Sequence, residues 1–137
     1  MPITTGFNHV ATLTTDLDRL VKFYVDAFEA IKSSEIPKRA DHPRMATIDL
    51  GGGAGLNVFE TTAEAIIGEQ RGQGDRGAID HFALSVDSLD TLRATRDRII
   101  AAGGYVGDIQ KLGSEWSLFF RDIDGMELEV CCHLGEG

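Results

Sequence analysis

The strongest constraint on the fold is an internal repeat, because the second half of the sequence aligns with the first at one fixed offset. His9 aligns with His81, an offset of 72 residues (81 − 9 = 72), and the alignment needs no gap. The same offset superimposes further identical residues: Ala11 and Ala83, Leu17 and Leu89, Asp18 and Asp90, Leu20 and Leu92, Ala30 and Ala102, Gly53 and Gly125, Leu56 and Leu128, Val58 and Val130. A repeat of this kind predicts two copies of one supersecondary unit.

Each half has the pattern of a strand, a helix and three further strands, which alternating and helically spaced apolar residues indicate. In the first half the expected strands cover 7–13, 31–36, 44–50 and 55–60, and the helix follows an N-cap at Thr15 or Asp16. In the second half the expected strands cover 79–86, 105–110, 115–120 and 126–132, with the helix over 88–102. The pattern predicts an α+β fold of two βαβββ modules, 1–60 and 78–137, joined by a linker over 61–77.

Charge and composition exclude several classes of partner. The net charge of −9 and the scattering of the 13 Lys and Arg residues argue against nucleic acid, whose binding requires a basic patch. The apolar runs are far shorter than a membrane span of roughly 20 residues and no secretory pattern is present, so we expect a cytoplasmic protein without a membrane partner. Cys131 and Cys132 are neighbours in the chain, and we interpret them as strand residues instead of a redox pair.

Strand alternation predicts where the second histidine of the repeat points. Side chains two residues apart lie on one face of a strand, and the face that a helix covers must be apolar. Phe82 and Leu84 fit the helix-facing side, so His81 points to the opposite face. In the last strand Val130 fits the helix-facing side, which leaves Glu129 on the same face as His81. We therefore expect an imidazole and a carboxylate to meet on one face of the second module.

The repeat transfers this geometry to the first module, where His9 is equivalent to His81 and Asn57 to Glu129. Two imidazoles and one carboxylate form the 2-His-1-carboxylate set that binds Fe(II) and other divalent ions while leaving coordination positions open. We predict that His9, His81 and Glu129 bind one divalent metal ion per site, with Fe, Mn, Ni, Co and Zn as candidates. The neutral amide of Asn57 is interpreted as a weak ligand or as a hydrogen-bond partner of water or substrate.

Other residues on the same faces are expected to contact a substrate. These substrate-facing candidates are Asn57, Met45, Thr47, Ser117 and Phe119. Glu127 lies on the same side of the last strand as Glu129, but we interpret it as a rim carboxylate in preference to a catalytic base. The sequence identifies no catalytic base.

Three stretches of the chain resemble the vicinal oxygen chelate superfamily, which contains glyoxalase I, methylmalonyl-CoA epimerase, extradiol dioxygenases, fosfomycin-resistance thiol transferases and bleomycin-binding proteins. NHVATLTTDLDRLVKFY resembles the start of the first module, IDHFALSVDSLD the start of the second, and FFRDIDGMELEV the final hairpin. The resemblance covers practically the whole chain. It implies a curved mixed sheet with helices on its outer face, a divalent metal at His9, His81 and Glu129, a small substrate with two adjacent oxygens, and a homodimer.

Two positions depart from the named members of this superfamily. Glyoxalase I and the epimerase carry Glu or Gln at the position of Asn57, and extradiol dioxygenases and fosfomycin transferases carry Tyr at the position of Phe119. The resemblance implies a metal-dependent enzyme that stabilises negative charge developing on its substrate, with lyase, isomerase and transferase chemistry unresolved. Two alternatives stay open: an Fe(II) extradiol-type ring-cleavage dioxygenase, and a metal-free protein that sequesters a drug or metabolite, as bleomycin-resistance proteins do.

Overall fold

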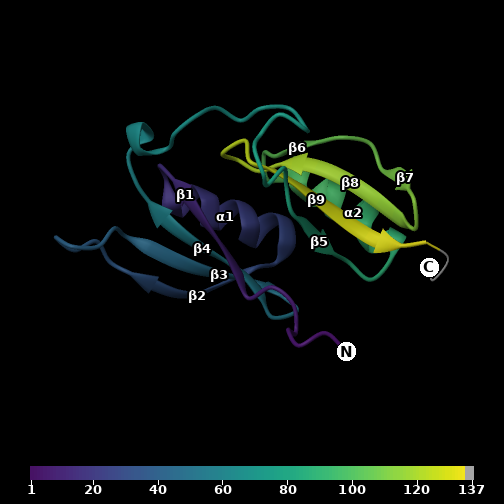
Figure 1. Cartoon of the computed structure of the whole chain (residues 1–137), viewed down its shortest axis with the longest axis horizontal. Helices are drawn as coiled ribbons and strands as arrows, with labels where there is room; N and C mark the ends of the chain where they lie inside the picture. The colour runs from purple at the N-terminus through teal and green to yellow at the C-terminus, as the bar shows by residue number, and fades with distance from the viewer. Residues whose placement is uncertain (135–137) are drawn as a thin grey trace. The chain divides into compact units, whose positions relative to one another are not determined.

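The computed structural model of the chain describes residues 1–134 (Figure 1). Residues 135–137, which the sequence pattern assigns to the second module, lie outside the described residues. The chain divides into two compact units, Met1–Ile67 and Gly68–Gly137, and each unit contains one copy of the repeat. Within residues 1–134, no helix combines the length and the apolar character needed to cross a membrane.

The first unit is a four-stranded mixed sheet with one helix packed on it (Figure 1). Its elements are β1 (His9–Thr14), α1 (Leu17–Phe28), β2 (Ile31–Ile36), β3 (Met45–Gly51), β4 (Ala54–Glu60) and a short 3-10 helix, η1 (Ala63–Ala65). The strand order is β1-β4-β3-β2, in which β1 and β4 are parallel and the other neighbours antiparallel. The buried apolar core contains Leu17, Leu20, Phe23, Tyr24, Ala27, Ile48, Leu56 and Val58. Each large side chain removed from water here stabilises the unit by about 1.5–3 kcal/mol.

Helix α1 begins at Leu17 because two carboxylates receive its first N–H groups. Asp16 accepts a hydrogen bond from Arg19 N at 3.1 Å, so Asp16 and not Thr15 is the N-cap. Glu60, at the end of β4, accepts a bond from Leu17 N at 2.8 Å. Both acids lie at the positive end of the helix dipole and satisfy donors that have no partner within the helix. The bond from Glu60 also ties α1 to the sheet of its own unit.

The second unit has the same plan with one strand divided. Its elements are β5 (Ala83–Ser85), α2 (Leu89–Ala101), β6 (Tyr105–Val106), β7 (Gln110–Leu112), β8 (Glu115–Arg121) and β9 (Glu127–His133). The sheet has the order β5-β9-β8-β6, with β7 also paired to β8. The apolar residues buried in this unit are Leu92, Ile99, Leu118, Phe120, Leu128, Val130 and Cys132.

Within each unit the strands pair in equivalent registers, offset by 72 residues, which confirms the repeat. In the first unit Ala11 of β1 pairs with Asn57 of β4, and in the second Ala83 of β5 pairs with Glu129 of β9. The antiparallel pairs of β3 with β4 and of β8 with β9 follow the same offset. The expected α+β class and the two βαβββ modules are therefore confirmed.

The strand expected over 105–110 is wrong in its extent, because the chain leaves the sheet between β6 and β7. Gly107 N still donates to Phe119 O at 2.9 Å, but its carbonyl accepts a hydrogen bond from Arg96 Nε at 3.0 Å. The Arg96 side chain on α2 thus binds the Gly107 carbonyl in place of a backbone N–H group of a neighbouring strand. Pairing with β8 resumes at Gln110.

The strand expected over 79–86 is shorter in the structure, where β5 covers only Ala83–Ser85. The reason lies at Asp80, whose carbonyl accepts a hydrogen bond from Arg76 Nη1 at 3.0 Å instead of joining a ladder. His81 consequently lies just before β5. The β9 neighbour still reaches this segment, since Glu129 N donates to Phe82 O at 3.1 Å.

Arg44 links three elements of the first unit through carboxylates. Its Nη2 lies 2.6 Å from Asp18 Oδ1 and 3.2 Å from Glu35 Oε1, and its Nη1 lies 3.6 Å from Glu60 Oε2. Hydrogen bonds from Arg44 hold the pKa of Asp18 and the pKa of Glu35 below their ordinary values. A lowered carboxyl pKa stabilises the fold above the unfolded pKa of about 4, and this contribution is lost as the pH falls through the lowered value.

Arg44→Ala is therefore expected to melt at a lower temperature than wild type at pH 7, with a difference that narrows as the pH falls below about 4. Thermal melts across this range measure the difference. Arg71→Ala is the matched control, because the Arg71 side chain is exposed and pairs with the exposed side chain of Asp75 at 3.7 Å. A difference for Arg44→Ala that is constant with pH would contradict the linkage to Asp18 and Glu35.

Candidate functional site

His81 and Glu129 lie side by side in the second unit. His81 is two residues before β5, and Glu129 lies within the neighbouring strand β9. His81 Nε2 is 3.0 Å from Glu129 Oε1. Of the three metal ligands expected from the sequence, the structure thus brings these two into direct contact.

Both carboxylate oxygens of Glu129 are bound. Ser117 Oγ, on β8, donates to Glu129 Oε2, and His81 lies at Oε1. Burial raises the pKa of the Cys131 thiol to about 12, so this thiol stays protonated and hydrogen bonds to Glu129. Burial acts to raise the pKa of Glu129, but the hydrogen bonds from Ser117, Cys131 and His81 outweigh it and hold this pKa below its ordinary value. Glu129 is accordingly ionised at neutral pH.

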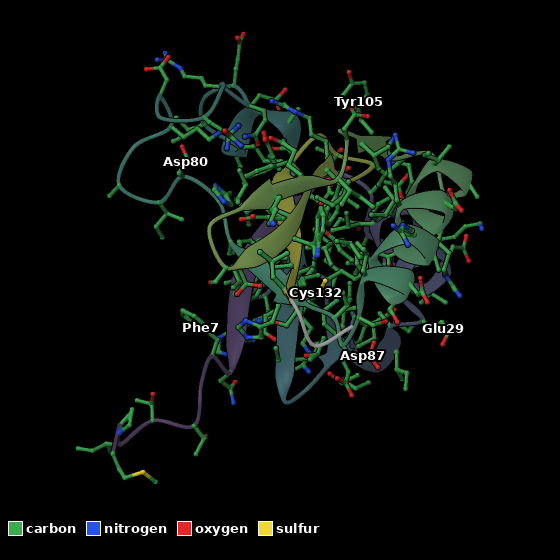
Figure 2. The ribbon with its side chains drawn as sticks, turned by 90° about the vertical axis from the view of Figure 1, so that its right-hand side faces the viewer. Phe7, Glu29, Asp80, Asp87, Tyr105 and Cys132 are labelled. Atoms are coloured by element: carbon green, nitrogen blue, oxygen red, sulfur yellow. The ribbon has the colours of Figure 1, made fainter. Side chains whose placement is uncertain are left out.

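His81 is held through both ring nitrogens. Its Nδ1 lies 2.6 Å from Asp80 Oδ1, and its Nε2 faces Glu129. Phe119 packs edge-on against the imidazole, with ring centroids 5.1 Å apart and planes at 73°. The hydrogen bond with Asp80 raises the pKa of His81 above its ordinary value, against the opposing effect of burial. Figure 2 labels Asp80 on the chain segment that leads into β5.

This geometry suits a metal ligand. Because Asp80 only accepts hydrogen bonds when ionised, His81 Nδ1 carries a proton, and in the neutral ring Nε2 then presents a lone pair. A lone pair and a carboxylate oxygen 3.0 Å apart repel each other unless a proton or a cation lies between them. Metal-bound histidines commonly donate their other ring N–H to a carboxylate or carbonyl oxygen. The His81–Glu129 pair therefore accommodates either a proton, as in the imidazolium form of His81, or a divalent cation, with Asp80 as the outer partner of the imidazole.

His9 repeats part of this arrangement in the first unit. Its Nδ1 lies 2.8 Å from Asn8 Oδ1, and Asn8 is equivalent to Asp80 in the repeat. In both histidines the preceding side chain thus binds Nδ1. This leaves Nε2 as the ring nitrogen that can bind a metal ion. Among residues 1–134, no three His, Cys, Asp or Glu side chains form a cluster that could hold a metal ion. His9 lies in the first unit, whereas His81 and Glu129 lie in the second.

The substrate-facing candidates differ in their exposure. Asn57 on β4 and Thr47 on β3 are paired neighbours and half-buried, whereas Met45 is 9% exposed. In the second unit Phe119 is half-buried against His81. Ser117 is fully buried and its hydroxyl binds Glu129, so its observed contact is with a candidate ligand.

Glu127 is part of an ion cluster with two arginines. Its Oε2 lies 2.5 Å from Arg76 Nη2 and 3.6 Å from Arg121 Nη2, and its side chain is 11% exposed. Gln73 Nε2 donates to its other oxygen at 3.4 Å. Both carboxylate oxygens of Glu127 are thus held by side chains of the second unit.

Sequence reasoning missed Asp80 and Arg76, which together support His81. One signal was present, because Asp80 precedes His81 as Asn8 precedes His9, and both can accept a hydrogen bond from the following imidazole. Nothing comparable marks Arg76, which lies in a segment with little apolar periodicity.

Comparison with known families identifies the class of protein. The chain matches the model of the Glyoxalase/Bleomycin resistance protein/Dioxygenase superfamily over residues 6–130, and it belongs to that superfamily. No curated protein matches the chain significantly in sequence.

Solved structures with the same fold include proteins whose names indicate different roles. A glyoxylase/bleomycin resistance protein/dioxygenase domain from Frankia sp. EAN1pec has 26% identity and a TM-score of 0.76, over 95% of this chain and 98% of that one. The fosfomycin resistance protein FosX from Listeria monocytogenes has 17% identity and a TM-score of 0.70, over 98% of each chain. TnmS3, an antibiotic binding protein from Streptomyces sp. CB03234, has 17% identity and a TM-score of 0.69, over 97% of this chain and 99% of that one. Membership in the superfamily thus leaves the activity open.

Proposed function

We propose that this protein is a metal-dependent enzyme that chelates two adjacent oxygens of a small substrate through a divalent ion held by His9, His81 and Glu129. The observation that carries the proposal is the His81–Glu129 contact, in which Nδ1 of the imidazole is bound by Asp80 and Nε2 faces an ionised carboxylate at 3.0 Å. The equivalent Asn8–His9 contact in the first unit supports His9 as the third ligand.

Bound at these residues, a divalent ion would act as a Lewis acid that stabilises negative charge developing on a substrate oxygen. Other side chains of the protein would orient the ligands and bind the substrate. Ser117 and Cys131 donate to Glu129 and fix its orientation, and Phe119 packs against His81. Asn57 and Thr47 offer an amide and a hydroxyl for hydrogen bonds to substrate or water.

Two observations favour other functions. A 2-His-1-carboxylate set is the usual ligand set of Fe(II) oxygenases, so a ring-cleaving dioxygenase of the extradiol type is the first alternative. The oxygens of Glu129 already have protein partners, and the fold is shared with the antibiotic binding protein TnmS3. A metal-free protein that sequesters a drug or metabolite is the second alternative.

A metal titration combined with activity assays distinguishes these functions. Protein stripped with a chelator is offered Fe²⁺, Mn²⁺, Ni²⁺, Co²⁺ or Zn²⁺ and assayed with α-hydroxy and α-keto compounds, and with catechols while oxygen consumption is recorded. We expect turnover that depends on added metal. Oxygen uptake with catechol and Fe²⁺ would support the dioxygenase, and tight binding of an antibiotic without metal or turnover would support the sequestering protein.

We also propose that the protein is a homodimer. Among residues 1–134, the outer strands of each sheet pair on one side only: β1 and β2 in the first unit, and β5, β6 and β7 in the second. Ile31 and Tyr105, on β2 and β6, are 63% and 73% exposed. Open sheet edges with apolar side chains favour association with another chain.

Light scattering at micromolar concentration is expected to give twice the mass of one chain. The mass should be the same with and without chelator, because the edges with exposed apolar side chains, β2 and β6, contain none of the proposed ligands His9, His81 and Glu129. A mass equal to one chain would contradict the dimer and leave the metal proposal unaffected.

A further inference from the structure

The Arg76 side chain is buried, although the composition of its segment does not predict a buried arginine. The segment from 68 to 80 carries three of the chain's glycines with φ above zero and little apolar periodicity, yet the Arg76 side chain is only 7% exposed. Its guanidinium spans two parts of the second unit. Nη2 binds Glu127 of β9 at 2.5 Å, while Nε donates to Arg71 O at 2.6 Å. The remaining nitrogen binds Asp80.

The contacts of Arg76 with Asp80 lead directly to the candidate site. Arg76 Nη1 lies 3.0 Å from Asp80 O and 3.2 Å from Asp80 Oδ1. The same Oδ1 lies 2.6 Å from His81 Nδ1, and Gly74 N donates to the other carboxylate oxygen, Oδ2. Asp80 is thus fixed at its carbonyl and at both carboxylate oxygens.

We propose that Arg76 is a positioning residue for His81, acting through Asp80. By holding the Asp80 carboxylate against Nδ1, it fixes the imidazole in the orientation and tautomer that direct Nε2 toward Glu129. This proposal deepens the proposed function. Only the predicted effect of Arg76 on metal affinity rests on that function. The orientation of His81 is a property of the metal-free protein.

The geometry requires an arginine at this position. A guanidinium presents five N–H donors in a planar fork, and here they reach Arg71 O, the carbonyl and Oδ1 of Asp80, and the carboxylate of Glu127. A lysine can replace the charge but has no fork. Glu127 also pairs with Arg121 at 3.6 Å, so it keeps one cationic partner when Arg76 is replaced. Loss of Arg76 is therefore expected to affect chiefly the position of Asp80.

Three variants test the proposal: Arg76→Gln, Arg76→Lys and Asp80→Asn. Arg71→Gln is the matched control, because the Arg71 side chain is 65% exposed and only its backbone carbonyl contacts Arg76. The first readout is the ¹⁵N NMR spectrum of the histidine rings in chelator-treated protein, with His81 assigned from the spectrum of His81→Gln. The second is the Kd for Zn²⁺, and melting curves establish that each variant is folded.

We expect Arg76→Gln and Asp80→Asn to change the ring ¹⁵N signals of His81 and to weaken Zn²⁺ binding by about 10- to 100-fold, the range typical of outer partners of metal-bound histidines. Arg76→Lys should weaken it less, and Arg71→Gln should match wild type in both readouts. A merely structural Arg76 would lower the melting temperature without moving the His81 signals.

Unchanged His81 signals in folded Arg76→Gln would overturn the proposal. If Arg76→Gln does not fold, Arg76→Lys decides, since it keeps the charge but loses the fork; wild-type signals there would likewise contradict positioning. Failure of wild type to bind any metal would overturn the proposed function alone, because the NMR comparison in metal-free protein still decides the role of Arg76.

Discussion

His81→Ala and Glu129→Ala are each expected to lose stable metal binding, with a Kd that rises by more than about 100-fold. Removal of an outer partner of a metal-bound histidine costs about 10- to 100-fold in affinity, and removal of a ligand itself costs more. Imidazole nitrogen and carboxylate oxygen are strong donors to divalent ions, and two protein ligands compete poorly with water. Titration of chelator-treated protein with Zn²⁺ or Co²⁺ measures the loss.

The metal-free forms of these variants are expected to be less stable as well. His81 Nδ1 hydrogen bonds to Asp80 and Ser117 Oγ donates to Glu129, and hydrogen bonds to charged groups contribute about 1.5–3 kcal/mol. The informative quantity is therefore the increase in melting temperature on adding metal, because a ligand that binds only the folded state raises it. His133→Ala is the control, since the His133 side chain is 74% exposed beside Glu115. A metal-induced shift in His81→Ala equal to that of wild type would exclude His81 as a ligand.

His9→Ala is expected to lose metal binding to a similar degree while melting like wild type in the presence of chelator. His9 is exposed, and its contact is with Asn8, its neighbour in the chain, so truncation leaves no cavity and no buried partner. Asn57→Ala is its control in the same unit, because a neutral amide is a weak donor and its loss should change the Kd by only a few fold.

Melting curves with and without chelator, recorded for both variants, test this pair of expectations. A metal-induced shift that survives in His9→Ala would remove the first unit from the site. A shift lost in Asn57→Ala but kept in His9→Ala would reassign the third ligand to Asn57.

The repeat and the strand alternation predict most of the fold because both depend only on the order of residue types in the sequence. An offset read from His9 and His81 reproduces the pairing of Ala11 with Asn57 and of Ala83 with Glu129. Alternation places Glu129 on the same face as His81, and the side chains are in contact. These predictions need only the period of a strand and the requirement that a helix covers an apolar face.

Two features could not be predicted: the break in the strand at 107–109 and the contacts that support His81. Both depend on side chains that contact residues elsewhere in the chain and that follow no periodic pattern. Arg96 of α2 binds Gly107 O, which no pattern in either segment indicates. Arg76 reaches Glu127 across 51 residues of chain, from a segment that reads as a linker. Long polar side chains adapt to many partners, so composition alone does not predict which one they find.

The metal-to-chain ratio of wild-type protein tests the central claim most directly. Chelator-treated protein is dialysed to equilibrium against each of Fe²⁺, Mn²⁺, Ni²⁺, Co²⁺ and Zn²⁺, and bound metal is determined by elemental analysis. One site with ligands from both units predicts one ion per chain for at least one of these metals, whichever chains contribute the units. A ratio of zero for all five metals would contradict the metal site, and a ratio of two would show that each unit binds its own ion and contradict a shared site.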